Sequence, residues 1–364
     1  MRMIRLNADY LDRVLAGETG LPARNTGPCA VAVGSFDGLH LGHQALVDAL
    51  RQAKRRGGLR STVLFTFRHH PRLVLGGGSG PFLLTTWREK LSVLEQLDLD
   101  VVVAIDFSRA LSQLDYRQFV QRFLVDWLGM THMVAGHDVH LGAGRGGSEQ
   151  SLRDLGADLG YTLEAVPATE AGGRVISSSA IRTALAAGDC ATATAMLGRP
   201  YALWGEVTPG DGRGRTIGYP TANVTPLNPR KLLPAPGVYA CRVQIPGDVT
   251  DENGDGALAT VTEPLPEIDR HGDMLTPGHA QWRVYGGMLN FGRVPTFHEG
   301  GLSEPRIEVN VFDFAGDLRG RNVKVEWLAR LRDERKFSGV EDLVGQLGED
   351  AGRAREAVDA AGKG

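Results

Sequence analysis

Cysteine is scarce in this sequence: its 364 residues include only Cys29, Cys190 and Cys241. The three lie far apart and form no CxxC pair, so their spacing fits neither a disulfide scaffold nor a zinc site and suits a reducing compartment. No apolar run approaches the roughly 20 residues that a membrane-spanning helix needs. Residues 1–17 alternate polar and apolar side chains, unlike a signal peptide. We therefore expect a soluble, cytoplasmic protein with no membrane partner.

A large net charge is also missing. The chain has 40 Lys and Arg against 43 Asp and Glu, which gives a formal net charge of −3. Proteins that bind nucleic acid through its phosphates usually carry a basic surplus, so we expect no nucleic-acid partner. The length suits about two domains of ordinary size, and no internal repeat is present. The sequence leaves open whether the chain forms a homo-oligomer.

The first half of the chain alternates strand-like runs with helix-like segments. Val-rich runs such as CAVAVG, STVLFTF, VVVAID and HMVAG are separated by amphipathic patterns such as TTWREKLSVLEQL and DYRQFVQRFLVDWL. This alternation predicts an α/β domain whose parallel sheet is covered by helices on both faces. Ligands bind such sheets at the carboxyl ends of the strands. We expect residues 34–43, 67–71 and 136–147 to lie at that edge.

The second half changes character after about residue 200. Alternating segments such as YALWGEV, VYACRVQI, WRVYGGMLNF and RIEVNVFDF are separated by turns rich in Gly, Pro and Asn. They predict a small antiparallel β-barrel or sandwich, closed by a helix at about 339–347. We therefore assign two domains, residues 1–198 and 199–364. The acidic, turn-rich stretch 246–280 is expected to be a long insertion between two strands.

A glycine-rich turn, GSFDGLHLGH, joins the first Val-rich run to a helix-like segment. Gly34, Gly38 and Gly42 let the backbone approach a ligand closely. A helix that begins near Gly42 directs its N–H groups and positive dipole end at the turn. His40 and His43 are three residues apart, so both can donate hydrogen bonds to one phosphate. The turn is therefore predicted to bind phosphate.

Two other interpretations of this turn remain. Asp37, His40 and His43 have a spacing that can hold zinc, although a helix N-terminus disfavours a cation. The histidines could instead do no more than cap the helix. The turn contains neither GKS/T nor GxGxxG, which excludes a Walker loop and a Rossmann-type dinucleotide site.

The stretch GSFDGLHLGHQ resembles the HxGH signature of the nucleotidyltransferase superfamily. In this form it is similar to the adenylyltransferase module of prokaryotic bifunctional riboflavin kinase/FAD synthetases. A second element of the superfamily falls late in that module, and VISSSAIR at 175–182 resembles its Ser-Ser-Thr-x-x-Arg motif, with Ser179 in place of Thr. The resemblance implies catalytic roles for His40, His43 and Arg182. It implies ATP or phosphate contacts for Gly34, Phe36, Asp37, Gly38, Gly42, Ser177, Ser178 and Ser179.

A second glycine-rich motif, GDGRGRTIGYPTANV, occupies residues 210–224. Its glycines and arginines suit a loop that closes over phosphates. Thr221 and Asn223 alternate along the backbone and present two neutral oxygens to one point, which suits Mg²⁺ bound to nucleotide phosphates. Without the Pro-Thr-Ala-Asn core, a solvated hairpin loop would be the simpler interpretation.

The same stretch closely resembles the riboflavin kinase signature, and GVYA, LNFGRVPTF, IEVNVFDF and LRDERKF follow in the family's order. In that family a glutamate on the strand before Phe-Asp-Phe is the catalytic base, and the matching residue is Glu308. Taken alone, Glu308 would be interpreted as an exposed strand carboxylate. The resemblance implies phosphate contacts for Gly210, Asp211, Arg213, Gly214, Arg215 and Gly218.

The two resemblances together imply one function. The chain is expected to phosphorylate riboflavin to FMN with ATP and to adenylylate FMN to FAD, with Mg²⁺ as cofactor and riboflavin, FMN and ATP as small-molecule partners. They imply a nucleotidyltransferase-like parallel sheet followed by a riboflavin kinase barrel. The family's flavin-side residues are matched here by His70, Asp138 and Gly142.

Two loops of the first module depart from the family pattern. Where the family has Thr-Phe-Asp-Pro-His-Pro, this chain has TFRHHP, so Arg68 replaces a carboxylate and reverses the local charge. In GHDVHLG, His137 replaces a glutamate, and Val139 and Leu141 replace aromatic residues that could stack on a ring. Two alternatives follow: a riboflavin kinase with a degenerate or repurposed nucleotidyltransferase module, or a non-catalytic flavin-binding or regulatory protein.

Overall fold

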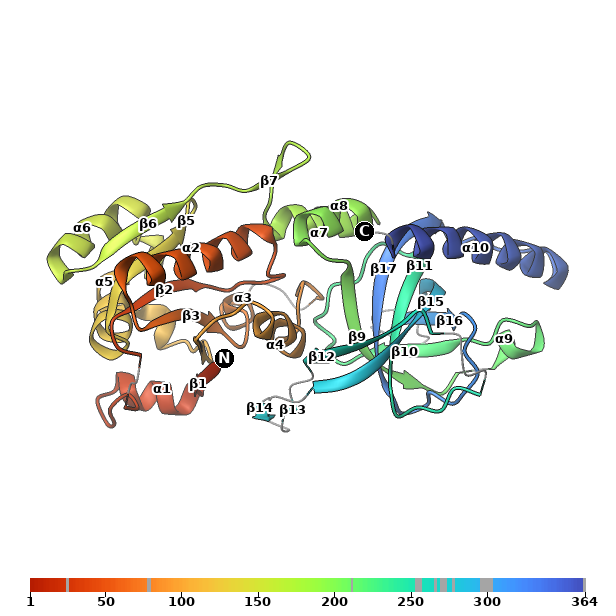
Figure 1. Cartoon of the computed structure of the whole chain (residues 1–364), viewed down its shortest axis with the longest axis horizontal. Helices are drawn as coiled ribbons and strands as arrows, with labels where there is room; N and C mark the ends of the chain where they lie inside the picture. The colour runs from red at the N-terminus through yellow and green to blue at the C-terminus, as the bar shows by residue number, and fades with distance from the viewer. Residues whose placement is uncertain are drawn as a thin grey trace. The chain divides into compact units, whose positions relative to one another are not determined.

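The computed structural model describes residues 1–23, 26–76, 80–210, 212–252, 257–264, 267–268, 274–276, 279–294 and 304–362. They form two compact units, Met1–Ser178 and Ser179–Gly364 (Figure 1). Asp211 and parts of the insertion expected at 246–280 lie outside the described residues. Among the residues that the structure describes, no helix combines the length and the apolar content needed to cross a membrane.

A six-stranded, all-parallel sheet is the centre of the first unit, with the strand order β1-β4-β3-β2-β5-β6. This confirms the predicted α/β class. Its strands are β1 (Arg2–Leu6), β2 (Cys29–Gly34), β3 (Ser61–Phe67), β4 (Val101–Ile105), β5 (Met130–Gly136) and β6 (Thr162–Val166).

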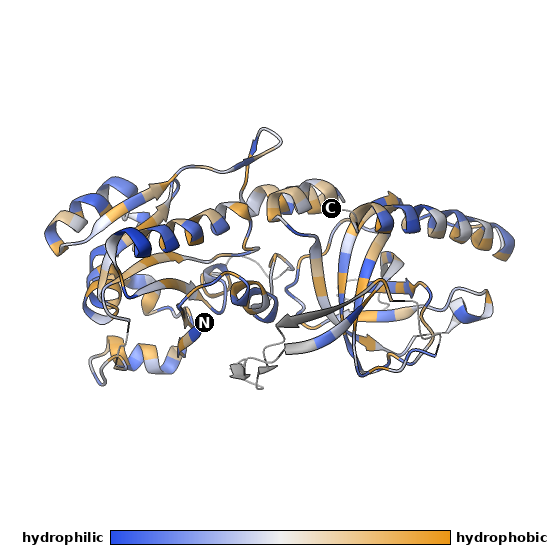
Figure 2. Ribbon diagram, viewed as in Figure 1, coloured by the Kyte–Doolittle hydropathy of each residue, from blue (hydrophilic) through white to orange (hydrophobic). Residues whose placement is uncertain are grey.

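Helices cover both faces of this sheet, which explains why its central strands are continuous apolar runs. One hydrophobic cluster includes Val63 and Phe65, and a separate cluster includes Leu64 between them, because alternate residues point to opposite faces. Helix α2 shows hydrophilic residues on its visible face beside the largely hydrophobic strands (Figure 2). The helices are α1 (Ala8–Leu15), α2 (Leu41–Gly57), α3 (Pro71–Val74), α4 (Trp87–Glu95), α5 (Tyr116–Phe119), its π-helical continuation (Val120–Trp127) and α6 (Glu149–Leu159).

The strand order reverses next to β2. From β2 the chain adds β3 and β4 on one side, and it then crosses to add β5 and β6 on the other. Open α/β sheets bind ligands at such a switch point, beyond the carboxyl ends of the strands. Residues 34–43 and 136–147 follow the adjacent strands β2 and β5, and residues 67–71 follow β3. The predicted edge is confirmed.

A closed six-stranded antiparallel barrel forms the second unit. The strands follow the order β11-β17-β9-β10-β16-β15, and β15 pairs back onto β11, so the barrel alternative is correct and the sandwich alternative is not. Strand β12 adds to β15. The elements are α7 (Ser178–Ala186), α8 (Cys190–Leu197), β9 (Tyr201–Thr208), α9 (Arg213–Thr216), β10 (Ala222–Pro226), β11 (Gly237–Pro246), β12 (Ala259–Pro264), β13 (Glu267–Ile268), β14 (Met274–Thr276), β15 (His279–Val294), β16 (Glu304–Val311), β17 (Asn322–Arg332) and α10 (Val340–Ala361).

Helix α10 is longer than the sequence suggested. The predicted end near residue 347 is wrong, because Ala354 and Val358 are buried and continue the apolar face of the helix. Asp350 on the same helix is fully buried and forms a bidentate ion pair with Arg332 at the end of β17. This pair fixes the helix on the barrel, since a buried carboxylate needs a charged partner.

Helices α7 and α8 pack with the barrel. The backbone N–H of Ala235 donates to Leu185 O on α7, and α8 lies against β9 and β17. The second compact unit therefore starts at Ser179. The domain boundary at residue 198 was assigned from the change of sequence pattern. It stays a prediction.

Candidate active sites

The turn after β2 contains three residues in the left-handed region of backbone space. Phe36 has φ 47°, Gly38 has φ 86° and Leu39 has φ 44°. Such angles are unfavourable for residues with a side chain and persist only where packing enforces them. Phe36 and Leu39 are both buried in the core beneath the turn. Packing therefore holds the turn in a shape that the chain would not adopt alone.

The predicted catalytic histidines meet at the start of α2. His40 is the N-cap, and its Nδ1 accepts a hydrogen bond from the backbone N–H of His43 at 3.3 Å. The two imidazole rings stack with centroids 3.6 Å apart. A Cβ atom on Gly42 would lie 3.2 Å from His40 Nδ1, so the glycine leaves room for this stack. A neutral His40 that accepts at Nδ1 carries its proton on Nε2.

Asp37 anchors the turn to the segment before α4. It is buried, and its carboxylate accepts hydrogen bonds from Leu84 N at 3.1 Å and from Thr85 N at 3.0 Å. Gly38 N donates to Thr85 Oγ1 at 3.0 Å. Within the described ranges, no group of three or more His, Cys, Asp or Glu side chains could hold a metal ion. The zinc interpretation of this turn therefore has no support.

The two predicted motifs of the first unit lie against each other. Ser178 Oγ donates a hydrogen bond to Asp37 O at 2.9 Å. Ile176 O lies 3.9 Å from a Cβ atom placed on Gly42. Segments far apart in sequence are thus in contact, with Ser177 directly before α7. Ser179 and Arg182 follow on α7, within the second unit.

Arg68, the residue expected to reverse the charge of the loop after β3, is paired. Its Nε lies 2.6 Å from Asp106 Oδ1 and its Nη2 lies 2.9 Å from Asp106 Oδ2, at the end of β4. Both side chains are largely buried. Arg5 adds a more distant contact to Asp106 at 3.8 Å. The guanidinium therefore does not present an isolated positive charge to the site.

The two histidines next to Arg68 differ in their surroundings. Burial, followed by the charge of Arg68, lowers the pKa of His69. His70 caps the short helix α3, because its Nδ1 accepts from Arg72 N at 3.1 Å, and its ring meets the edge of Phe82. The flavin contact assigned to His70 stays a prediction.

The loop after β5 is shaped by close packing. A Cβ atom on Gly142, which has φ 75°, would lie 2.3 Å from Tyr116 N, so only glycine fits there. Val139 and Leu141 pack against the hydrophobic cluster of the unit, where they fill space instead of offering an aromatic surface. His137 and Asp138 are exposed.

Sequence reasoning missed a buried charged residue beside the turn after β2. Lys90 on α4 is buried, and its Nζ donates to Ser35 O at 2.6 Å and to Phe67 O at 3.4 Å. Burial lowers the pKa of Lys90 to about 8, although the charge of Asp37 opposes the shift. The Thr86–Glu89 capping box marks the start of α4 in the sequence, but it does not indicate that Lys90 is buried.

The predicted phosphate loop of the barrel lies against the predicted metal-binding pair. A Cβ atom on Gly210 would lie 1.7 Å from Asn223 Nδ2, and one on Gly214 would lie 3.3 Å from Thr221 Oγ1. Part of the expected loop is the short helix α9, which contains Gly214. Arg213 and Arg215 are also on this helix and Gly218, with φ 83°, follows it, whereas Asp211 lies outside the described residues.

A row of polar side chains crosses three neighbouring barrel strands. Glu308 on β16 is paired in register with Asn223 on β10 and with Asn290 on β15. Residues paired across strands share one face of a sheet, so the three side chains lie side by side. Arg306 Nη2 donates to Glu308 Oε1 at 2.8 Å. The strand register thus brings the predicted base beside the predicted metal ligand.

Further residues of this row were missed from the sequence. Asn290 Nδ2 donates to Glu334 Oε1 at 3.2 Å. A Cβ atom on Gly292 would lie 2.3 Å from that oxygen, so the glycine makes room for Glu334. Asn310 is buried and its Nδ2 donates to Pro220 O at 2.7 Å, which anchors the Pro-Thr-Ala-Asn turn. These contacts depend on register, which spacing along the chain does not give.

Two family models match the two halves of the chain separately. The family model for FAD synthetase matches residues 23–180, and that for riboflavin kinase matches residues 197–358. The bifunctional riboflavin kinase/FMN adenylyltransferase of Bacillus subtilis is 36% identical over 322 residues, which cover 88% of this chain and 89% of the relative. The Escherichia coli K12 protein of the same name is 34% identical over 328 residues, covering 90% and 92%.

A solved structure has the same fold over nearly the whole chain. It is described as a macrolide-efflux protein from Streptococcus pneumoniae, and it matches with a TM-score of 0.75 and 29% identity over 98% of this chain and 99% of its own. That description concerns the streptococcal protein alone. On the two family models and the relatives that match over most of their length, this chain belongs to the bifunctional riboflavin kinase/FMN adenylyltransferase family.

Proposed function

We propose that this chain phosphorylates riboflavin to FMN and then joins FMN to the adenylyl group of a second ATP, which yields FAD. The observation that carries the proposal is that the turn with His40 and His43 and the polar strand row with Glu308 lie in different compact units. The family models match in the same order along the chain. Each reaction then has its own site.

In the barrel, Glu308 acts as the general base. Arg306 holds Oε1 of its carboxylate, and Oε2 accepts the proton of the ribityl 5′-hydroxyl of riboflavin. The hydroxyl oxygen bonds to the γ-phosphorus of ATP as the bond to the bridging oxygen breaks, and ADP leaves. Phosphoryl transfer depends mostly on positioning and charge stabilisation, so one base and a phosphate clamp suffice.

The residues beside Glu308 fit Mg²⁺. Thr221 Oγ1 and Asn223 Oδ1 are neutral oxygens, which Mg²⁺ accepts when nucleotide phosphates and water supply its other ligands. The missing side chain of Gly210 leaves room for the amide of Asn223. Mg²⁺ held there would neutralise charge on the transferred phosphates. We assign the phosphate clamp to Gly210, Asp211, Arg213, Gly214, Arg215 and Gly218.

At the turn after β2, the phosphate of FMN attacks the α-phosphorus of ATP and pyrophosphate leaves. This phosphate is already a nucleophile near neutral pH, so the step needs no base. His40, His43 and the N-terminus of α2 stabilise the negative charge that develops on the α-phosphate oxygens. We assign pyrophosphate binding to Ser177, Ser178, Ser179 and Arg182. We assign the shape of the turn to Gly34, Phe36, Asp37, Gly38 and Gly42.

We assign binding of the flavin in the second reaction to His70, Asp138 and Gly142. Asp106 neutralises Arg68, which weakens the electrostatic argument for a degenerate module.

All three cysteines are buried and none forms a disulfide. We therefore keep the cytoplasm, a reducing compartment rich in ATP, as the proposed location.

One assay tests the proposal. Purified protein is incubated with riboflavin, ATP and Mg²⁺, and the flavins are separated chromatographically; we expect FAD. FMN as the final product would indicate a kinase alone, and unchanged riboflavin would indicate a binding protein. Removal of Mg²⁺ with EDTA should stop FMN formation, and added Mg²⁺ should restore it.

The Glu308→Ala variant tests the separation of the sites. It should lose FMN formation and keep the conversion of added FMN to FAD. Loss of both reactions in a variant that is still folded would contradict two separate sites.

A further inference from the structure

Lys90 is placed where two strand ends of the first unit meet. Its ammonium donates to Ser35 O, directly after β2, and to Phe67 O, the last residue of β3. Ser35 precedes Phe36, the first strained residue of the turn, and Phe67 precedes Arg68. One side chain from α4 therefore links the turn assigned to ATP with the loop that follows β3.

An ammonium in this position is unfavourable for folding. Lys90 is only 6% exposed, and burial of a charged group costs free energy unless nearby groups compensate. A neutral donor would satisfy the same two carbonyls at a smaller desolvation cost. The positive charge therefore needs a reason of its own.

Asp37 supplies that reason. Its carboxylate is buried within the turn, and an uncompensated negative charge there would oppose the binding of phosphates. The negative charge of Asp37 favours the protonated form of Lys90 and raises its pKa against the effect of burial. The ammonium offsets the carboxylate, so that the N–H groups of α2 and the two histidines act on an anion without a competing negative charge.

We propose that Lys90 is a positioning residue for adenylyl transfer: its ammonium fixes the carbonyls of Ser35 and Phe67 and offsets Asp37, and this holds the turn at residues 36–43 ready for the phosphates of ATP. The proposal rests on the proposed function of the first unit. Lys90 is buried and donates to two backbone carbonyls, so its proposed role involves no contact with the substrates. It acts through the backbone of the turn and through charge.

The test is Lys90→Met, which keeps the length of the side chain and removes the ammonium. We expect kcat for the conversion of FMN to FAD to fall about 10- to 100-fold, because small displacements of reacting groups have effects of this size. The KM for FMN should stay within about twofold, since the proposed role of Lys90 involves no contact with the flavin. Phosphorylation of riboflavin by the same protein should be unchanged. Lys90→Arg, which keeps the charge, should recover part of the loss.

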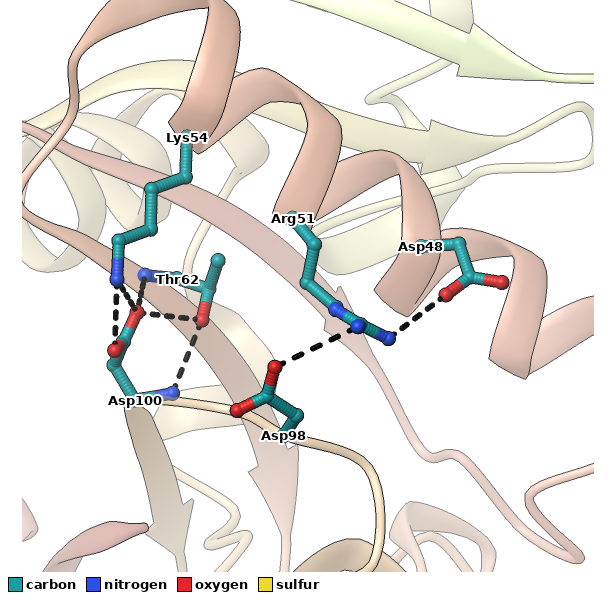
Figure 3. Close-up of polar contacts among 6 residues, drawn as sticks. All are labelled: Asp48, Arg51, Lys54, Thr62, Asp98 and Asp100. Atoms are coloured by element: carbon teal, nitrogen blue, oxygen red, sulfur yellow. Dashed lines mark hydrogen bonds and ion pairs between the residues drawn. The ribbon is translucent and has the colours of Figure 1, made fainter.

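Lys54→Met is the matched control. Lys54 is on the last turn of α2 and pairs with Asp100 before β4, at the amino ends of the strands (Figure 3). The same substitution there removes an ammonium from the same unit, far along the strands from the turn. Both reactions should proceed at the wild-type rate. A comparable loss of FAD formation in this control would show that general destabilisation explains the effect.

Two results would overturn the role of Lys90. Wild-type kcat in a folded Lys90→Met protein is the first. The second result concerns Lys90→Gln, which keeps a hydrogen-bond donor without the charge. This variant is used if a thermal melt shows that Lys90→Met is unfolded. A kcat of Lys90→Gln within about twofold of the wild-type value would show that the charge is dispensable. Failure of the wild-type protein to convert FMN would instead overturn the proposed function of the unit, and the role of Lys90 with it.

Discussion

The parallel-sheet unit and the barrel place their reactive side chains on different kinds of structure. In the parallel-sheet unit the assigned groups are on turns after the strands, and their geometry depends on left-handed backbone angles, a helix cap and anchors such as Asp37. In the barrel Asn223, Glu308 and Asn290 are on the strands, and the register alone aligns them. The geometry of the turn site depends on the hydrogen bonds and packing that anchor the turn, whereas the geometry of the strand site depends on strand pairing in the sheet.

This difference predicts different responses to substitution. On a barrel strand, a changed side chain should affect the chemistry and leave the backbone in place. On the turn, the same kind of change also affects the cap and the helix start, so chemistry and stability change together unless the substitution keeps the cap. The following predictions test this contrast.

The largest effect is expected at Glu308. Glu308→Gln keeps the shape of the side chain and removes the base, so phosphorylation of riboflavin should slow by about 10²- to 10⁴-fold. The melting temperature should stay close to that of the wild type, because the strand pairing does not involve the carboxylate. Initial rates of FMN formation, measured chromatographically beside a thermal melt, check both statements. A large loss of stability would contradict a strand site held by register.

The next effect is expected at His40, which both caps α2 and is assigned to the phosphates. Asn is a good N-cap, so His40→Asn should keep the stability and lower the conversion of FMN to FAD by about 10²- to 10³-fold. His40→Ala should lose as much activity and a further ~1 kcal/mol of stability, because the cap is gone. Denaturant unfolding and FAD formation separate the two variants. Equal stability of the two would show that the cap contributes nothing.

A smaller effect is expected at Gly210. A methyl group there would overlap Asn223 Nδ2, so Gly210→Ala must displace the amide assigned to Mg²⁺. We expect FMN formation to fall about tenfold and its Mg²⁺ requirement to rise, since the ligand is shifted and not lost. Gly345→Ala on α10 is the control, because a Cβ atom there has no neighbour within 4 Å. If wild type and Gly210→Ala had the same Mg²⁺ dependence, the assignment of Asn223 as a metal ligand would be wrong.

The contrast also explains what the sequence could and could not predict. His40 and His43 share one short turn, so spacing along the chain was enough to predict that they meet. The resemblance assigned Asp37 and Ser178 to one module, but their contact appears only in the structure. Lys90, Asp106 and Asn290 were missed, because their partners come from other strands or helices and depend on tertiary packing.

The helix ends show the same limit. The early stop predicted for α10 followed from the polar and Ala-rich composition after residue 347. The structure continues the helix because small side chains fit closely against the barrel and Asp350 meets Arg332. The composition of such a helix mainly reflects its exposed, polar face. Its buried face is recognised only when the element that packs against it is known.

The smallest effect is expected at Asp100, at the end of the parallel sheet opposite to the turn. Asp100 accepts hydrogen bonds from Lys54 Nζ at 2.7 Å and from Thr62 N at 2.7 Å (Figure 3). Partial burial acts to raise the pKa of Asp100, but the hydrogen bonds from Lys54 and Thr62 outweigh it and hold the pKa below its usual value. Asp100→Asn should cost about 1 kcal/mol of stability at pH 7, because the pair is partly exposed, and neither reaction should slow.

The pH dependence of that cost has a definite sign. Because the pKa of Asp100 is lower in the folded than in the unfolded protein, its carboxylate stabilises the fold fully above the unfolded value of about 4. The contribution is lost as the pH falls through the folded value. The stability difference between wild type and Asp100→Asn should therefore be largest near neutral pH and shrink below about pH 4, which denaturant unfolding at several pH values measures. A constant difference would mean that the Asn side chain disturbs packing. If Asp100→Asn slowed adenylyl transfer, the two ends of this sheet would be coupled. That result would contradict a site whose geometry depends only on its own turn and anchors.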